Sequence, residues 1–265
     1  PFFAAQRSLF RAYDIRGSRQ HFTDDFVHAL GCAFAHLYQL QKNIDNNKNI
    51  IVIGYDVRRD SDVIAQKLAA ILNKCGLQVI QLGLITTPMM VFWAEQYQGH
   101  GIVVTASHSA KNILGVKWLV NHQSPSVEDI QALYQQVIHH QLGQRSLDNS
   151  LLAERGLYQH EIQKMALHKD DESLKTASVE QAYLSPKQVA NAYIKTIVQV
   201  FEDLYPHSTK ASISHSDQFH MTDDQSPLAK LDLIVIIDCM HGATSNIAQP
   251  LFEHFCQHVI MLNDS

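Results

Sequence analysis

The sequence predicts an α/β protein with two parts. Residues 1–140 form a three-layer α/β/α domain with a mixed sheet, and residues 185–265 begin a second, similar α/β domain. Two observations lead to this prediction. Short apolar segments rich in β-branched residues alternate with segments of helical periodicity, and turn or cap residues separate them. Alternation of this kind is typical of a sheet covered by helices on both faces.

The first predicted helix begins at Thr23-Asp-Asp25. A hydroxyl can cap the free backbone amides there, and acids suit the positive end of the helix dipole. A strand is predicted over Asn49–Ile53, and Asp60-Ser61 is predicted to cap the next helix. Gly76 should end that helix in the left-handed conformation, which glycine adopts without steric cost.

The next predicted strand covers Leu77–Leu82. Thr87-Pro88 then begins a helix, because proline fits the first helical position. Two apolar strands follow over Gly101–Thr105 and Gly115–Val120, and a helix over Val127–His140 completes the first domain.

The second part begins after a polar insertion or linker, residues 141–184, and contains another polar insertion, residues 207–225. The predicted elements are a helix capped by Ser185-Pro186, a strand over Leu231–Ile237, a helix that continues through His258 and a strand over Val259–Leu262. One βαβ unit cannot cover both faces of a parallel sheet. We therefore expect the chain to be cut inside its second domain.

Composition excludes several classes of protein. Apolar residues make up 46% and charged residues 18% of the chain, which is typical of a globular protein. The net charge is −5 without a sustained basic run, so nucleic acid is not an expected partner. No apolar run approaches the roughly 20 residues that span a membrane. The four cysteines are widely spaced, which favours reduced thiols in a cytoplasmic protein.

The segment from Gly101 to His108 has the strongest functional signal. An apolar strand ends in Thr105-Ala-Ser-His108, which puts Ser107 at the carboxyl end of a strand, where open α/β sheets place their chemistry. Ser107 is therefore a potential nucleophile. The alternative is a turn in which serine and histidine hydrogen-bond to their own backbone. Lys117 returns to the same neighbourhood if the following strand pairs with this one.

Four other segments accompany the serine segment: Phe10-Arg-Ala-Tyr-Asp-Ile-Arg-Gly17, Ile53-Gly-Tyr-Asp-Val-Arg58, Gly83-Leu-Ile-Thr-Thr-Pro88 and Asp238-Cys-Met-His-Gly-Ala243. Together they resemble the α-D-phosphohexomutases, and within that family the bacterial phosphomannomutase/phosphoglucomutase type. The resemblance covers residues 10–120 well and residues 186–262 more loosely. Departures from the family pattern occur at Tyr55, Val57, Ser109, Ala110, Leu114, Met240 and His241.

The resemblance implies an isomerase that moves a phosphoryl group between the 1- and 6-positions of mannose or glucose. Ser107 would carry the phosphoryl group and, through its phosphate, help to hold Mg²⁺. The other metal ligands are expected beyond the end of this chain, so the chain alone should be inactive. Hexose 1,6-bisphosphate would be the intermediate and activator, a sugar phosphate the partner, and the full-length protein a monomer or weak dimer.

The resemblance also assigns roles to single residues. Arg16 and Lys117 would be catalytic and would bind substrate together with Tyr13. Arg16 can grip phosphate with two donors. Lys117 would neutralise charge or act as a general acid or base, or it simply extends from a strand end toward water. His108 would be catalytic by donating to the phosphate or orienting the serine, or it is structural.

Three further residues are predicted to support the serine loop. Asp56 and Arg58 would pair to brace it, with substrate contact as the alternative, and Gly115 matches a family glycine. A second function remains open, because the departures also fit a weak or inactive sugar-phosphate-binding homologue. A serine hydrolase is disfavoured, because no Gly-x-Ser-x-Gly elbow occurs.

Overall fold

A computed structural model describes residues 3, 5–41, 49–139, 182–205 and 230–264 of the chain. The predicted insertion at 207–225, and that at 141–184 up to residue 181, lie outside the described residues. Within the described part, no helix is long and apolar enough to cross a membrane.

A six-stranded mixed sheet forms the centre of the first domain. Its order is β1 (Ile15–Ser18), β5 (Ile113–Leu119), β4 (Gly101–Val104), β2 (Ile50–Tyr55), β3 (Gln78–Leu84) and β6 (Ala182–Tyr183). The β5 strand runs antiparallel to β1 and β4, and the remaining pairs are parallel. The predicted mixed sheet is therefore confirmed.

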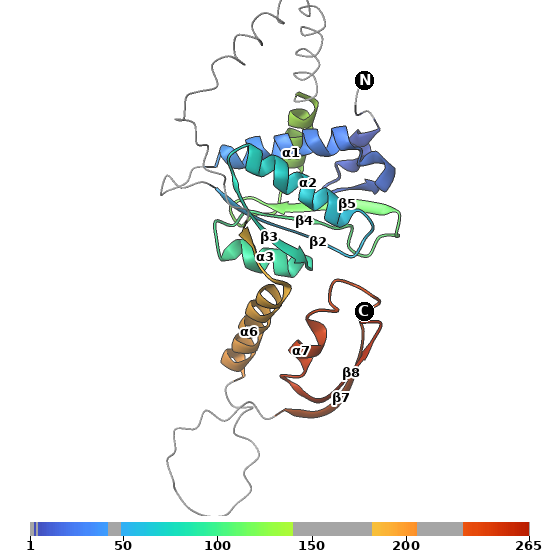
Figure 1. Ribbon diagram of the computed structural model, residues 1–265, viewed down its shortest axis with the longest axis vertical. Helices are drawn as coiled ribbons and strands as arrows, with labels where there is room; N and C mark the ends of the chain where they lie inside the picture. Colours follow the sequence, from blue (N-terminus) through green and yellow to red (C-terminus); the bar gives the residue numbers. More distant parts are fainter. Residues whose placement is uncertain (1–2, 4, 42–48, 140–181, 206–229, 265) are drawn as a thin grey trace, which may run out of the picture.

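Helices cover both faces of this sheet (Figure 1). On one face lie α1 (Asp24–Gln39), α2 (Ser61–Lys74) and a helix over residues 127–139. On the other lie α3 (Thr87–Glu95) and α6 (Pro186–Leu204). The two apolar clusters between sheet and helices are the core, and they confirm the three-layer architecture.

The helix termini follow the predicted chemistry in four cases, one of which is Pro88 in the first turn of α3, and depart from it in one. Thr23 accepts a hydrogen bond from the Phe26 amide at 3.3 Å, Ser185 forms a capping box with Gln188, and Gly76 has a φ of 85°. The cap predicted at Asp60 is wrong. Asp60 makes no side-chain cap hydrogen bond, because its φ is 69° and its carboxylate pairs with Arg19.

The end of the predicted linker takes part in the first sheet. β6 pairs with β3, and the Gln81 side chain donates to the Tyr183 hydroxyl at 2.7 Å. The helix α6 packs on the face of the sheet that α3 also covers, and there Trp93 Nε1 donates to the Val189 carbonyl oxygen at 3.3 Å. Residues from both sides of the predicted boundary at residue 184 thus contact the first domain, while the division into domains stays a prediction.

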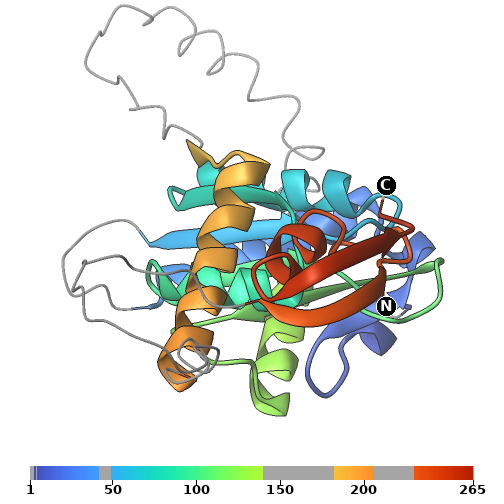
Figure 2. The same ribbon diagram turned by 90° about the horizontal axis from the view of Figure 1, so that it is seen from below.

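The C-terminal unit consists of β7 (Leu231–Asp238), α7 (Ala248–Phe252) and β8 (Cys256–Leu262), and its two strands are parallel. It lies beside α6, as Figure 2 shows, and the rings of Phe201 and Phe255 are 4.7 Å apart. The helix predicted to continue through His258 ends at Phe252. The chain turns there, and the Phe255 carbonyl oxygen accepts from the Leu231 amide at 2.8 Å to begin the strand pairing.

Candidate active site

Ser107 lies three residues after the end of β4, in a strained backbone conformation. Its φ is 54°, which is unusual for a residue with a side chain. The Ser107 amide donates to Thr105 Oγ1 at 2.9 Å, and the Thr105 hydroxyl donates to Asp56 Oδ2 at 2.7 Å. Serine, threonine and aspartate therefore form a chain of hydrogen bonds from the end of β4 to the end of β2. His108 Nδ1 lies 3.4 Å from Ser107 Oγ.

Arg58 holds the serine loop by its backbone. Its Nη2 donates to the carbonyl oxygens of Ser107 and Ser109 at 2.6 and 2.7 Å. Its Nη1 donates to those of Ala110 and Ile113 at 2.7 and 3.2 Å. A planar guanidinium has several donors in a fixed geometry, which suits this set of carbonyl oxygens. The loop shape thus depends on one side chain from the end of β2.

Asp56 orients Arg58 in turn. Its Oδ2 accepts from Arg58 Nε at 3.1 Å, and its Oδ1 accepts from the Ser61 hydroxyl at 2.8 Å and the Arg58 amide at 3.0 Å. With Thr105 as a fourth donor, both carboxylate oxygens are fully engaged. This geometry favours bracing of the serine loop over direct contact with a substrate.

Gly115 allows the strands around the loop to approach each other. A Cβ atom at this position would lie 2.6 Å from the Thr105 carbonyl oxygen and 2.7 Å from that of Ile15. Both are backbone atoms of neighbouring strands and cannot move away cheaply. Glycine is therefore required where β1, β5 and the start of the serine loop meet.

Two predicted cations gather around one buried carboxylate. Arg16 Nε donates to Asp14 Oδ2 at 3.1 Å, and Lys117 Nζ lies 3.5 Å from the same oxygen. The ring of Tyr13 lies 6.0 Å from the Arg16 guanidinium carbon and 5.5 Å from Lys117 Nζ. Arg16 Nη1 also donates to Ser109 Oγ at 3.3 Å, which connects this cluster with the serine loop.

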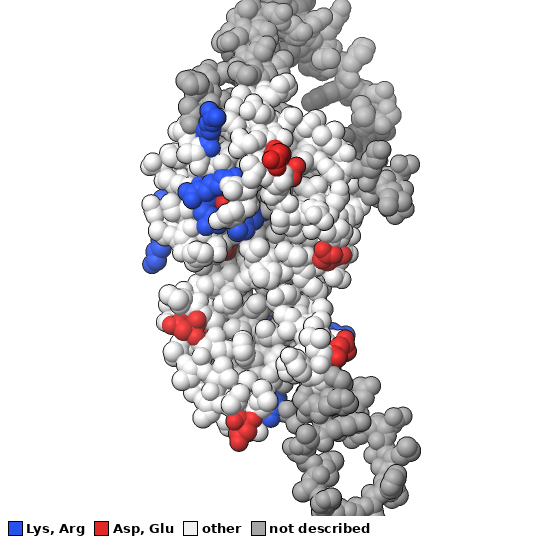
Figure 3. Space-filling model, turned by 180° about the vertical axis from the view of Figure 1, so that it is seen from behind, with Lys and Arg blue, Asp and Glu red and all other residues white. Residues whose placement is uncertain are grey.

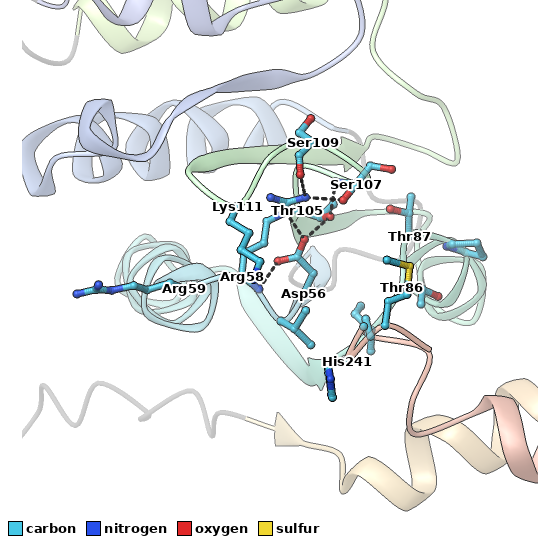
Figure 4. Close-up of a pocket in the computed structure, with 16 residues that line it drawn as sticks. Asp56, Arg58, Arg59, Thr86, Thr87, Thr105, Ser107, Ser109, Lys111 and His241 are labelled. Atoms are coloured by element: carbon cyan, nitrogen blue, oxygen red, sulfur yellow. Dashed lines mark hydrogen bonds and ion pairs between the residues drawn. The ribbon is translucent and has the colours of Figure 1, made fainter. Parts of the chain in front are cut away.

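A cavity of about 710 Å³ opens beside the serine loop. Figure 4 shows Ser107 and Ser109 on one side of it, Thr86 and Thr87 on another, and His241 opposite the serines. Of the predicted site residues, three line this cavity: Asp56, Arg58 and Ser107. The others do not line it: Tyr13, Arg16, His108, Gly115 and Lys117. The cations of the Asp14 cluster thus approach the serine loop from outside the cavity.

The far wall of the cavity is the turn after β7. Met240 and His241 both have positive φ, 49° and 53°. Asp238 holds the turn, and its pKa is lowered from the ordinary value by hydrogen bonds from the Asn263 side chain and then from the Met240 amide. The turn predicted from Asp238 and Gly242 therefore has a second role as a cavity wall.

Sequence reasoning did not assign several cavity residues. Thr86 and Thr87 lie in one of the motifs quoted above but had no role, and Lys111 carried no signal beyond its place in the serine loop. Asp14 lies in the quoted segment Phe10–Gly17, but its contact with both Arg16 and Lys117 was not predicted. A single buried acid in a loop has no periodic pattern that would mark it.

The charges of this surface favour an anionic ligand. Figure 3 shows Lys and Arg side chains gathered in one patch, whereas Asp and Glu are scattered. Within the described ranges, no group of three or more His, Cys, Asp or Glu side chains is arranged to hold a metal ion. Asp14 and Asp56 are engaged by cations and hydroxyls, so the described carboxylates do not form a magnesium site by themselves.

Comparison with known proteins agrees with these observations. A family model described as phosphoglucomutase/phosphomannomutase, alpha/beta/alpha domain I, matches residues 7–142. A phosphoglucomutase of Neisseria gonorrhoeae is 31% identical over 129 residues, 48% of this chain and 27% of that protein. A phosphoglucosamine mutase of Campylobacter jejuni is 22% identical over 257 residues, 97% of this chain and 46% of that protein.

A solved structure shares the fold. The phosphoglucomutase/phosphomannomutase family protein of Burkholderia thailandensis superposes with a TM-score of 0.63 at 20% identity, over 98% of this chain and 44% of that chain. The present chain therefore spans less than half the length of these relatives.

Proposed function

The chain belongs to the phosphoglucomutase/phosphomannomutase family, and from this premise we propose that it is part of a phosphosugar mutase. The reaction is the interconversion of hexose 1-phosphate and hexose 6-phosphate, with mannose and glucose as the expected sugars. The relatives are named for glucose and glucosamine phosphates, so both sugar types belong in the test. We further propose a cytoplasmic protein that is a monomer or weak dimer at full length.

The observation that carries this proposal is the position of Ser107. Its strained loop follows β4, lines a cavity and is braced by Arg58 and Asp56. A phosphoryl carrier must be held in line with the acceptor hydroxyl, because phosphoryl transfer depends on positioning and charge neutralisation. A braced serine at a cavity wall meets the first requirement.

The chemical step transfers the phosphoryl group from Ser107 to the sugar. The bond between serine Oγ and phosphorus breaks while a bond from the sugar hydroxyl oxygen to phosphorus forms. The hydroxyl proton passes to a general base, for which His108 is the candidate, and the leaving serine oxygen takes up a proton from the ammonium of Lys117, the candidate general acid. Arg16 and Lys117 supply positive charge beside the loop, and Tyr13 covers both.

Magnesium would supply further neutralisation of the phosphate, since it is a hard ion that prefers oxygen ligands. The phosphate on Ser107 would be its one ligand from the described residues, because Asp14 and Asp56 are engaged elsewhere. The remaining ligands are expected from outside these residues. Hexose 1,6-bisphosphate is the proposed intermediate and activator.

The test uses the full-length protein. Intact-mass analysis and peptide mapping should find a phosphoryl group on Ser107, and Ser107→Ala should abolish both the modification and turnover of glucose, mannose or glucosamine phosphate. A modified residue other than Ser107, with Ser107 bare, would contradict the proposal. Phosphorylation and substrate binding without turnover would instead identify an inactive sugar-phosphate-binding homologue.

A further inference from the structure

Asp14 is the most deeply buried charged group near the serine loop. Its side chain is 1% exposed, and its Oδ2 receives two hydrogen bonds from Arg16, one from Nε at 3.1 Å and one from Nη2. Lys117 Nζ lies 3.5 Å from the same oxygen. One carboxylate oxygen of Asp14 is therefore the common partner of Arg16 and Lys117.

The fold explains why these groups meet. Asp14 lies one residue before β1, and Arg16 on β1 pairs with Gly115 on the antiparallel strand β5. Lys117 is two residues further along β5 than Gly115. Directly paired residues, and residues two apart on one strand, project from the same face of a sheet, so Arg16 and Lys117 share a face. Without a common counter-ion, two cations held beside one carboxylate oxygen would repel each other.

Asp14 also has an unusual energetic position. Its Oδ1 is buried and has no hydrogen-bond partner among the described residues. A buried carboxylate that is only half satisfied costs stability, and an apolar side chain in the same place would avoid that cost. A buried polar group with such a cost is a candidate for a functional role.

The cluster is connected to the serine loop through Arg16. Its Nη1 donates to Ser109 Oγ at 3.3 Å, two residues after Ser107. Arg16 is 11% and Lys117 24% exposed, so each has limited freedom once it is tied to Asp14. The aspartate thus restrains both cations at the edge of the loop.

We propose that Asp14 is a positioning residue, which aligns Arg16 and Lys117 for the phosphate on Ser107 without itself touching the substrate. The inference rests on the function proposed above. It predicts that the negative charge of Asp14, more than its volume, sets the geometry of the two cations.

The experiment compares Asp14→Asn with Asp14→Glu in the full-length protein. Asn preserves the size and removes the charge, so kcat should fall about 10²-fold while KM for the sugar phosphate changes little. Glu preserves the charge and should restore part of kcat. The matched control is Asp60→Asn, which breaks the exposed ion pair with Arg19 and should leave kcat unchanged.

A second measurement is independent of turnover. In ¹H–¹⁵N spectra, the Nε–H signal of Arg16, assigned with Arg16→Lys, should be sharp and exchange slowly in the wild type. It should broaden or exchange rapidly in Asp14→Asn. If the protein has no mutase activity, this signal still decides whether Asp14 holds Arg16, so failure of the proposed function is distinguishable.

Two outcomes would overturn the inference. One is a wild-type kcat in Asp14→Asn. The other is an unchanged Arg16 signal accompanied only by a lower melting temperature, which would indicate a purely structural role. If Asp14→Asn does not fold, Asp14→Glu decides alone. The inference then requires a folded protein with reduced kcat, nearly normal KM and a shifted Arg16 signal, and it fails if that signal is unchanged.

Discussion

Arg58 donates a hydrogen bond of 2.6 Å from Nη2 to the carbonyl oxygen of Ser107. The proposed phosphoryl carrier is thus held by its backbone, and its hydroxyl stays available for chemistry. The same guanidinium reaches three further carbonyl oxygens of the loop and the carboxylate of Asp56. Positioning of the serine therefore depends on a residue from the loop that follows β2.

Two replacements of Arg58 should distinguish the effect of its positive charge from the effect of its hydrogen-bond geometry. Lysine keeps the charge but cannot reach four carbonyl oxygens and Asp56 together, so Arg58→Lys should lower turnover by about 10²-fold through loss of positioning. Arg58→Ala also leaves the carboxylate of Asp56, which is 12% exposed, without its cation, and this should cost about 3 kcal/mol in free energy of unfolding, the low end for a buried pair. Urea denaturation and steady-state kinetics measure the two effects.

The control for stability is Arg59→Ala. Arg59 is 79% exposed and lies 3.9 Å from Asp60, so its removal should change the free energy of unfolding by less than about 0.5 kcal/mol. Equal losses of stability in the alanine variants of Arg58 and Arg59 would contradict the bracing role.

The backbone of Ser107 makes a prediction of its own. Its φ of 54° is costly for a residue with a Cβ atom, by roughly 1–2 kcal/mol. Both Ser107→Gly and Ser107→Ala lack the hydroxyl, but only glycine relieves this strain. The free energy of unfolding from urea titrations should therefore be about 1 kcal/mol higher for the glycine variant than for the alanine variant. A less stable glycine variant would mean that the loop is not held in this conformation in solution.

The alanine variants of Arg16 and Lys117 should each lose turnover strongly. Both side chains are cations tied to Asp14 beside the serine loop. Loss of a charge that acts mainly in the transition state typically lowers kcat by about 10²-fold or more. Circular dichroism verifies the fold, and steady-state kinetics with hexose 1-phosphate measures the loss.

Arg19→Ala is the matched control for these two variants. Arg19 is partly exposed and pairs with Asp60 instead of Asp14. Its turnover should remain within a few-fold of the wild type. Nearly normal turnover in the Arg16 or Lys117 variant would show that the assigned roles are wrong.

Local signals in the sequence were sufficient for most of the first domain. The caps at Thr23 and Gly76 and the proline at position 88 act within one turn of a helix, so their effect is visible in a few adjacent residues. The apolar strands of the sheet were found for the same reason, with ends displaced by one or two residues. The position of Ser107 after a strand was predicted because the apolar residues of β4 mark that strand clearly.

The remaining features depend on contacts between distant segments. β6 is only two residues long, so no periodicity can mark it, and it exists because β3 offers an open edge. The sequence around Asp60 is typical of a helix cap, but its carboxylate pairs with Arg19, which is more than 40 residues away and gives no local signal. The clamp of Arg58 on four carbonyl oxygens has no sequence signal, since carbonyl groups occur at every residue.

His100 should make the stability of the first domain depend on pH. Its side chain is buried, its Nδ1 accepts from the Asn121 amide at 3.2 Å, and its ring lies 5.1 Å from that of Tyr38. Burial, and secondly the nearby His122, lower the pKa of His100 to about 4. His122 Nδ1 lies 2.8 Å from Glu95 Oε1, so the nearby histidine is itself in contact with a carboxylate.

The direction of this pH dependence follows from the protonation of His100 in the unfolded and folded states. The unfolded chain takes up the proton near the ordinary pKa of 6.5, whereas the folded protein resists it until about pH 4. The contribution of His100 is therefore complete above pH 6.5 and is lost as the pH falls toward 4. Between pH 7 and pH 5 the free energy of unfolding should decrease by about 2 kcal/mol from this group.

The variant His100→Gln isolates this contribution from the other histidines. Glutamine can accept from the Asn121 amide but does not titrate, so its urea-unfolding free energy should change less than that of the wild type over the same pH interval. The wild type should lose more stability on acidification, by about 2 kcal/mol. Parallel pH profiles of the two proteins would show that His100 is protonated in the folded state as readily as in the unfolded chain.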